Sequence, residues 1–194
     1  MKLNSVCVYC ASSSKINKIY FEAARELGKL LAENDIRCIC GAGRKGLMAS
    51  LTDGVIDNGG SVKGIIPRFM YEEGWYHPNI DDLILTDSMH ERKSLMAEHS
   101  DAVIAMPGGC GTLEELLEII TWKQLGLYFN PIVILNINGY YDPLIQMFNQ
   151  AIEESFMKPE QSELWMVANT PQEALELLYA AESWHENPRK FAAI

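Results

Sequence analysis

The sequence predicts an α/β fold: a doubly wound, mainly parallel sheet of the Rossmann-like type, in a single domain. Short apolar runs alternate with longer segments of helical periodicity, as in successive βαβ units. Turns rich in glycine or serine follow several of the apolar runs, where a parallel sheet places its loops. Because the 194 residues contain no linker or repeat, we expect one nucleotide-binding domain over 1–194.

The first three strands and the helices between them follow one another directly. A short apolar strand is predicted at Ser5 to Cys10, and a helix at 16–32 has apolar residues three or four apart. The second strand, Ile36 to Cys40, leads into a helix at 47–56. The third strand, Ser61 to Ile66, stops at a proline, which cannot donate a hydrogen bond within a sheet.

The second half of the chain repeats this alternation. Strands are predicted at Asp101 to Met106, Pro131 to Leu135 and Trp165 to Ala168, with helices at 87–99, 111–126, 140–155 and 171–183. Two of these helices carry start signals of their own. Ser88 and Glu91 fit a capping box, as do Thr170 and Glu173, where Pro171 takes the first helical position.

Two loops are expected to meet at one edge of the sheet. In a strand order 3-2-1-4-5, the winding reverses between strands one and four, and ligands of such folds bind beyond the carboxyl ends there. Strand one is followed by Ala11 to Ser14, and strand four by Pro107 to Thr112. The loops richest in small and hydroxyl residues therefore line the predicted crevice.

The loop from Pro107 to Thr112 is the strongest functional signal in the chain. Gly108, Gly109 and Gly111 would let the backbone approach a ligand closely, and Thr112 adds a hydroxyl at a helix start. Unpaired N–H groups and the helix dipole favour an anion at such a place. The sequence therefore predicts a phosphate site.

Carboxylates follow the anion loop on the same predicted helix. Glu114, Glu115, Glu118 and Thr121 fall on one polar arc at helical spacing. Acidic residues are also favoured in the first turn of any helix. The position directly behind a phosphate site favours a chemical role, above all for Glu114 and Glu115.

Two cations stand near the start of the predicted helix 87–99. Arg92 and Lys93 follow Met89 and His90, although the helix dipole disfavours positive charge there. Such a departure from local preference is typical of a functional site. Arginine can also hold a phosphate or a carboxylate with two parallel hydrogen bonds.

Two further segments are open to more than one interpretation. Gly41 to Gly46 fits the dinucleotide pattern G-x-G-x-x-G, but it follows the second strand, and the third strand ends without a ribose-binding acid. The alternative is a second glycine loop lining a mononucleotide crevice. The irregular stretch 67–78 has the character of a lid. Its aromatic residues could stack on a base or pack beneath the loop, and Glu72 and Glu73 could meet a ribose hydroxyl.

Composition disfavours several classes of protein. The net charge of −10, from 26 acidic and 16 basic residues, argues against a nucleic-acid polymer as partner. No apolar run approaches the ~20 residues that span a membrane, and the N-terminus lacks a signal-peptide pattern, so we expect a cytoplasmic protein. Cys7 and Cys10 should point to opposite faces of one strand, like buried thiols rather than zinc ligands, and Cys38 and Cys40 lie in a second apolar run. No metal is expected.

Together these motifs closely resemble the LONELY GUY family of cytokinin-activating phosphoribohydrolases, whose bacterial members were long labelled possible lysine decarboxylases. Pro107 to Glu115 matches the family pattern Pro-Gly-Gly-x-Gly-Thr-x-x-Glu, and Met89 to Lys93 matches Met-His-x-Arg-Lys. Thr121 to Gly126 matches Thr-Trp-x-Gln-Leu-Gly, and the resemblance covers nearly the whole chain. Ala42 and Ala49 depart from it, because the family usually has glycine there.

The resemblance implies hydrolysis of the N-glycosidic bond of a nucleoside 5′-monophosphate, AMP or N6-substituted AMP, to free base and ribose 5-phosphate. It implies Arg92 and Glu115 as the catalytic pair, no cofactor, and a homodimer. A carboxylate near the anomeric carbon would stabilise an oxocarbenium-like state and orient water. Substrate contacts are expected from Ser12, Glu73, Met89, Lys93, Gly108, Gly109, Gly111, Thr112, Glu114 and Thr121.

Two other classes stay open on the residues alone. A nucleotide-binding or carrier module without catalysis would use the same anion loop, and tight binding without product would favour it. An NAD(P)-linked enzyme would rest on Gly41, Gly43 and Gly46, and a lack of NAD(P) binding would end that hypothesis.

Overall fold

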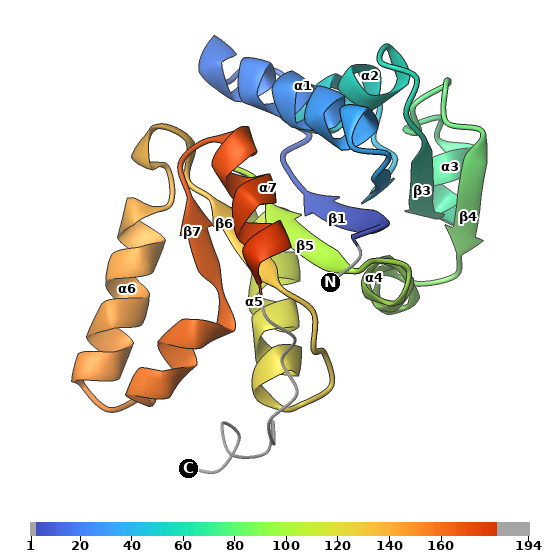
Figure 1. The fold of residues 1–194 in the computed structure, drawn as a ribbon. Coiled ribbons are helices and arrows are strands. Elements are labelled where there is room, and N and C mark those ends of the chain that lie inside the picture. Colours follow the sequence, from blue (N-terminus) through green and yellow to red (C-terminus); the bar gives the residue numbers. More distant parts are fainter. Residues whose placement is uncertain (1–2, 182–194) are drawn as a thin grey trace.

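The computed structural model describes residues 3–181, which form one parallel sheet with helices on both faces (Figure 1). The strands are β1 (Ser5–Tyr9), β2 (Arg37–Cys40), β3 (Val62–Pro67), β4 (Asp82–Thr86), β5 (Ala102–Ala105), β6 (Ile132–Leu135) and β7 (Met166–Ala168). The helices are α1 (Lys18–Glu33), α2 (Gly46–Ile56), α3 (Arg68–Glu72), α4 (Met89–Glu98), α5 (Cys110–Gln124), α6 (Asp142–Glu153) and α7 (Pro171–Ala180), with 3₁₀ segments η1 (Ile137–Gly139) and η2 (Pro159–Leu164). The end of the last predicted helix, 182–183, lies outside the described residues.

The strand order of the sheet confirms the predicted fold class. The strands lie in the order β4-β3-β2-β1-β5-β6-β7, and every neighbouring pair is parallel. The predicted strands four and five are β5 and β6, so the expected order 3-2-1-4-5 is present. The winding reverses between β1 and β5, which pair from Val6 with Ala102 to Tyr9 with Ala105. The loops that follow these two strands therefore leave the same edge of the sheet.

The stretch after β3 is more regular than the sequence suggests. The expected irregular segment 67–78 contains the short helix α3, and it is followed by β4 at the edge of the sheet. Strand β4 was not predicted, because it begins with Asp82 and aspartate is rare in strands. Asp82 is accommodated because its carboxylate pairs with Lys63 on the neighbouring strand β3 at 3.0 Å and with Arg37 on β2, one strand further, at 2.6 Å.

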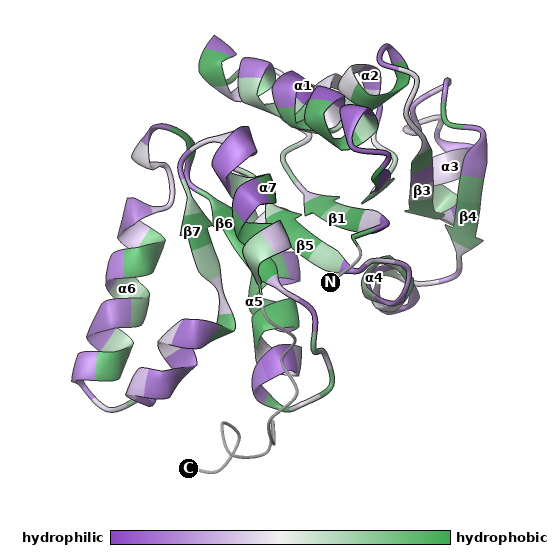
Figure 2. Ribbon diagram, viewed as in Figure 1, coloured by the Kyte–Doolittle hydropathy of each residue, from purple (hydrophilic) through white to green (hydrophobic). Residues whose placement is uncertain are grey.

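Alternation along the strands divides the core into two layers, and the strands are the most uniformly apolar elements (Figure 2). Val6 and Val8 pack on the side of α1, α2 and α7, whereas Cys7 and Tyr9 pack on the side of α4, α5 and α6. Cys10 joins the first layer, so the prediction that Cys7 and Cys10 point to opposite faces is confirmed. Both are buried free thiols.

The helix starts show how local sequence fixes the geometry. The Ser88 hydroxyl accepts a hydrogen bond from the Glu91 amide at 3.1 Å, and the Thr170 hydroxyl accepts one from the Glu173 amide at 3.1 Å. The Glu91 carboxylate reaches back one residue further than a standard capping box and accepts from the Asp87 amide at 2.8 Å. The cap places the start of α4 beside the crevice. Within residues 3–181, none of the helices has the length and apolar character needed to cross a membrane.

Candidate active site

The loops after β1 and β5 lie together at the switch point, as predicted. The Ala11 amide donates to the Pro107 carbonyl at 3.3 Å, which ties one loop to the other. A cavity of about 420 Å³ opens above them. Its lining includes most of the predicted site residues: Ser12, Met89, Arg92, Gly109, Gly111, Thr112, Glu114 and Glu115. The fold thus brings together residues from β1, α4, β5 and α5.

Two tyrosines hold the β5 loop from behind. The Tyr140 hydroxyl donates to the Gly108 carbonyl at 2.6 Å, and the Tyr141 hydroxyl donates to the Met106 carbonyl at 2.7 Å. Both follow β6 outside any recognisable motif, so the sequence does not indicate their role. With these carbonyls bonded away from the crevice, the loop has a fixed backbone before any ligand arrives.

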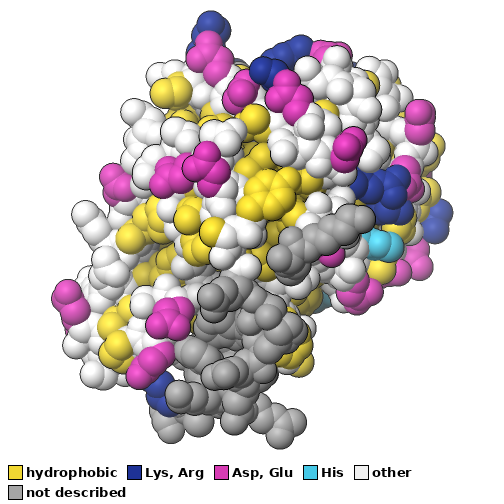
Figure 3. Space-filling view, viewed as in Figure 1, with side chains coloured by type: hydrophobic (Ala, Val, Ile, Leu, Met, Phe, Trp, Pro, Cys, Tyr) yellow, Lys and Arg dark blue, Asp and Glu magenta, His cyan; other side chains and the backbone are white. Residues whose placement is uncertain are grey.

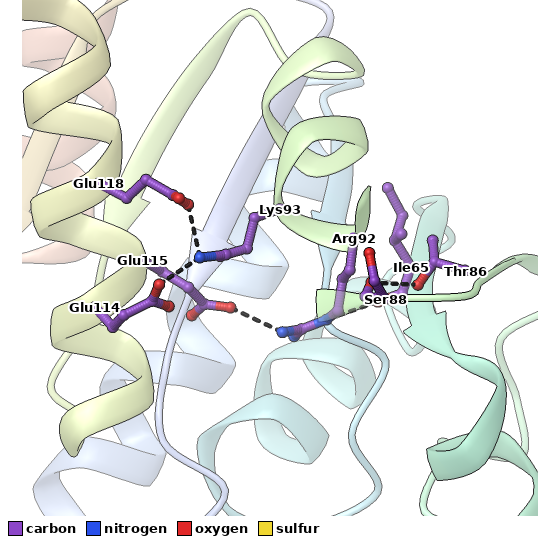
Figure 4. A network of polar contacts seen from close by, with 8 residues as sticks. All are labelled: Ile65, Thr86, Ser88, Arg92, Lys93, Glu114, Glu115 and Glu118. Carbon is purple, nitrogen blue, oxygen red and sulfur yellow. Dashed lines mark hydrogen bonds and ion pairs between the residues drawn. The ribbon is translucent and has the colours of Figure 1, made fainter. Parts of the chain in front are cut away.

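A buried ion pair crosses the crevice between α4 and α5 (Figure 4). The Arg92 Nη1 atom donates to the Glu115 Oε1 atom at 3.0 Å, and each side chain is only 10% exposed. The Arg92 Nε atom donates to the Ile65 carbonyl at 3.0 Å, at the end of β3. Burial raises the pKa of Glu115, and the charge of Arg92 offsets part of that rise. The result is a carboxylate with raised proton affinity, which suits a general base.

A second ion-pair cluster lies beside the first (Figure 4). Lys93 is buried, and its ammonium pairs with Glu114 and, at 2.9 Å, with Glu118. Burial alone would lower the pKa of Lys93, but the hydrogen bonds and charges of the two carboxylates outweigh it and raise the pKa. Lys93 therefore remains charged and is held between α4 and α5 by its two glutamate partners. The prediction of Lys93 as a substrate contact did not anticipate these two partners.

The crevice continues into a second cavity of about 560 Å³ on the side of α3. Glu73, Trp75 and the loop Gly41 to Gly46 contribute to its lining. The two cavities share residues that include Ser12 and Arg92. Arg92 therefore stands where the two cavities meet.

The aromatic residues after α3 divide between the two roles that the sequence left open. Tyr71 and Tyr76 stack on each other with ring centroids 4.5 Å apart, so they pack within the segment. Trp75 is 51% exposed and faces the second cavity. The His77 amide donates to the Ala42 carbonyl at 2.8 Å, which anchors this segment on the β2 loop.

Two predicted substrate contacts lie away from the anion loop. Glu73 lines the second cavity and not the first. Thr121 is exposed on α5, donates to the Leu117 carbonyl at 2.7 Å, and lines a separate hollow with Trp122. Among residues 3–181, no group of three or more His, Cys, Asp or Glu side chains is placed to hold a metal ion.

Fold and site together define a doubly wound α/β protein with a charged, glycine-lined crevice at its topological switch point. The family model described as "Possible lysine decarboxylase" matches residues 48–178, and the chain belongs to this family. The match runs from within α2 to within α7 and includes both Arg92 and Glu115.

Curated relatives extend the comparison over almost the whole chain. A rice protein (Oryza sativa subsp. japonica) named "Probable cytokinin riboside 5′-monophosphate phosphoribohydrolase" is 41% identical over 185 residues, 95% of this chain and 76% of the relative. An Arabidopsis thaliana protein named cytokinin riboside 5′-monophosphate phosphoribohydrolase is 40% identical over 95% of this chain and 86% of its own length.

Solved structures share the fold at lower sequence identity. A molybdenum cofactor binding protein from Rippkaea orientalis superposes with a TM-score of 0.70 at 21% identity, covering 93% of this chain and 98% of the other. The molybdenum cofactor carrier protein of Chlamydomonas reinhardtii gives a TM-score of 0.70 at 21% identity, over 93% and 100% of the two chains. At this identity the likeness shows the architecture alone.

Proposed function

We propose that this protein hydrolyses the N-glycosidic bond of a nucleoside 5′-monophosphate, releasing free base and ribose 5-phosphate. The observation that carries the proposal is the buried Arg92–Glu115 pair, set directly behind a glycine loop at the switch point. The names of relatives about 40% identical to this chain support the same reaction. AMP and N6-substituted AMP are the proposed substrates.

In the proposed reaction the loop after β5 holds the 5′-phosphate through its backbone amides and Thr112. Water adds to the anomeric carbon as the bond to the base breaks and positive charge develops on the sugar. Glu115 stabilises that charge and accepts the proton of the water, while the departing base takes up a proton. Arg92 keeps the carboxylate in place. Phosphate binding at a distance from the bond supports the reaction at the sugar.

The two cavities suggest how the substrate is divided between them. The ribose phosphate belongs in the cavity of the β5 loop, near Ser12 and Met89, and the base extends past Arg92 into the second cavity. There Trp75 offers an aromatic face and Glu73 a carboxylate. The second cavity is the larger of the two, so it has room for a base that carries a substituent.

A panel of purine and pyrimidine monophosphates tests the proposal. The purified protein is incubated with AMP, N6-substituted AMP and the matching nucleosides, and free base is measured by chromatography. We expect base from at least one monophosphate, and much less from the nucleoside that lacks the phosphate. Tight calorimetric binding of a nucleotide with no product would instead favour the carrier hypothesis.

We further propose that the protein is a homodimer and that the face around the end of α5 joins the two copies. Four large apolar side chains are exposed there: Leu117, Leu125, Leu127 and Phe129. The hollows that contain Leu117 and Leu127 share Trp122, so the apolar surface is continuous. Thr121 lies within it, which would bring this residue close to a second copy. Light scattering on a sizing column should give twice the chain mass of 21.8 kDa.

The proposed partner is a small molecule and not a nucleic-acid polymer. On the face seen in Figure 3, acidic side chains are widely scattered and basic side chains form no continuous stripe. This agrees with a net charge of −10. The buried free thiols of Cys7 and Cys10 support a reducing compartment, and we propose the cytoplasm.

A further inference from the structure

The guanidinium of Arg92 is surrounded on three sides. Its Nε atom donates to the Ile65 carbonyl and its Nη1 atom to Glu115, each at 3.0 Å. Its Nη2 atom lies against the backbone of Gly41, so closely that a Cβ added at this position would overlap Nη2 and approach Cζ to 3.1 Å. The direction of the side chain is therefore set by two hydrogen bonds and one missing side chain.

The backbone of Gly41 gives no other reason for glycine. Its φ is not positive, unlike that of Gly46 in the same loop, so an L-residue can adopt its conformation. The atoms nearest to an added Cβ all belong to the Arg92 side chain. Space for the guanidinium is thus what alanine at position 41 would remove.

We propose that Gly41 is a positioning residue, which directs the Arg92 guanidinium onto Glu115 by leaving room for it beneath the second cavity. The inference rests on the role of Arg92 in the proposed function. It also gives the loop after β2 a role in hydrolysis in place of the dinucleotide site that its pattern suggests. The guanidinium is the end of a flexible side chain, so the clash would be relieved by moving it, at the expense of catalysis and not of the fold.

The test is Gly41→Ala, with Gly60→Ala as a matched control. A displacement of the guanidinium by about 1 Å should lower kcat by up to about 10²-fold, with a small change in KM and in melting temperature. At Gly60, which has an ordinary φ, an added Cβ would meet Ala32 Cβ at 2.6 Å and Val55 Cγ1 at 2.8 Å, in the core and far from the crevice. The control should therefore melt earlier and keep its kcat. Full activity in Gly41→Ala overturns the proposal.

A double-mutant cycle separates positioning from general damage. Arg92→Lys removes the guanidinium for which Gly41 leaves room. It should therefore lower kcat much less in the Gly41→Ala background than in the wild type. If the two losses simply multiply, Gly41 does not act through Arg92 and the proposal fails.

The pH profile gives a further readout. Moving Arg92 away removes the nearest positive charge from Glu115, so the acid limb of kcat/KM should shift to higher pH. The other charged groups facing Glu115 are Lys93 and Glu114, which are unchanged. The remaining titratable groups are the thiols of Cys7 and Cys10 and the hydroxyls of Tyr9 and Tyr141, whose pKa values burial raises. An unshifted limb together with a lowered kcat would contradict the assignment.

A measurement without turnover keeps the inference independent of the reaction. The Nε–H of Arg92 should give a slowly exchanging ¹⁵N NMR signal because Ile65 holds it, and that signal should move or broaden in Gly41→Ala. An unmoved signal overturns the positioning role whatever the activity. Absence of base release from every nucleotide, with the signal moved, would end the proposed function but leave the positioning role supported.

Discussion

The two glycine-rich loops of the crevice keep their glycines for different reasons. In the loop after β2 the protein itself fills the space beside them: Gly41 faces a side chain, and a Cβ at Gly46 would lie 2.7 Å from backbone oxygens of the β1 loop. In the loop after β5, Gly108 likewise faces a side chain, that of Thr112, but a Cβ at Gly109 or Gly111 would meet nothing within 4 Å, and neither of these two residues has a positive φ.

This difference separates glycines that serve packing from glycines that serve a ligand. Where neither backbone conformation nor a neighbouring atom requires glycine, the free space points to something from outside the chain. Gly109 and Gly111 meet this description, at a helix start suited to an anion. The G-x-G-x-x-G pattern from Gly41 to Gly46 does not need a dinucleotide to explain it. Absence of NAD(P) binding in a titration would agree with this view.

The largest effect is expected at Glu115, on the helix α5 that follows the β5 loop. Glu115→Gln keeps the size of the side chain but removes the base, so kcat should fall by about 10²- to 10⁴-fold while nucleotide still binds. Initial rates and calorimetry measure the two quantities. Full activity in this variant would show that Glu115 is not the general base, and the loop after β5 would then be a binding site only.

The next largest effect is expected in the loop after β2, where Gly46 packs against the β1 loop. Gly46 has a φ of 65° and close backbone neighbours, so Gly46→Ala should lower the free energy of unfolding by about 2–4 kcal/mol. Gly59→Ala is the control for backbone strain alone, because its φ is 75° and nothing lies within 4 Å of its Cβ. Denaturant unfolding of both variants measures the difference. Equal losses would mean that packing against the β1 loop contributes nothing.

A smaller change in the free energy of unfolding, of opposite sign, is expected in the loop after β5. Gly111 lies in the first turn of α5, so Gly111→Ala should raise the free energy of unfolding by up to about 1 kcal/mol. The added methyl should obstruct the phosphate and raise the Kd of ribose 5-phosphate about tenfold, or roughly 1.4 kcal/mol. If binding were unchanged, the free space beside this residue would not belong to the ligand.

The smallest change is a displacement of the pH profile. Because burial raises the pKa of Glu115, the acid limb of kcat/KM should lie above the ordinary glutamate range of about 4.3, with activity lost as pH falls. The stability effect has the opposite direction: this carboxyl favours the folded state at low pH, and that contribution is lost as pH rises through the raised pKa. Rates measured between about pH 4 and about pH 8 locate the limb. A limb at or below the ordinary range would contradict the burial effect.

Most of the fold could be predicted because each element carries its own local signal. Six strands, their order around β1 and the starts of α4 and α7 follow from apolar runs and capping residues. The edge strand β4 could not be predicted, because Asp82 is acceptable only when Arg37 and Lys63 lie beside it. Such long-range compensation is visible only after folding.

The candidate site divides in the same way. The β5 loop, Arg92 and Glu115 stand out by residue type and spacing, and the fold brings them together. The partners that set their geometry do not stand out, since Ile65 contributes a carbonyl and Tyr140 a single hydroxyl. A contact made by a backbone atom, or space left free by a glycine, cannot be recognised from residue type and spacing.

The ion pairs of Lys93 with Glu114 and Glu118 affect the rate at which a nucleotide associates with the protein. A nucleotide dianion approaching a chain of charge −10 is repelled at long range, and the positive charge of Lys93 is already neutralised by its two glutamate partners. Added salt screens that repulsion over about 10 Å at 0.1 M, so encounter should become faster as ionic strength rises. This is the reverse of the behaviour of enzymes that attract anions with a basic surface, because the amides proposed to hold the phosphate act only at short range.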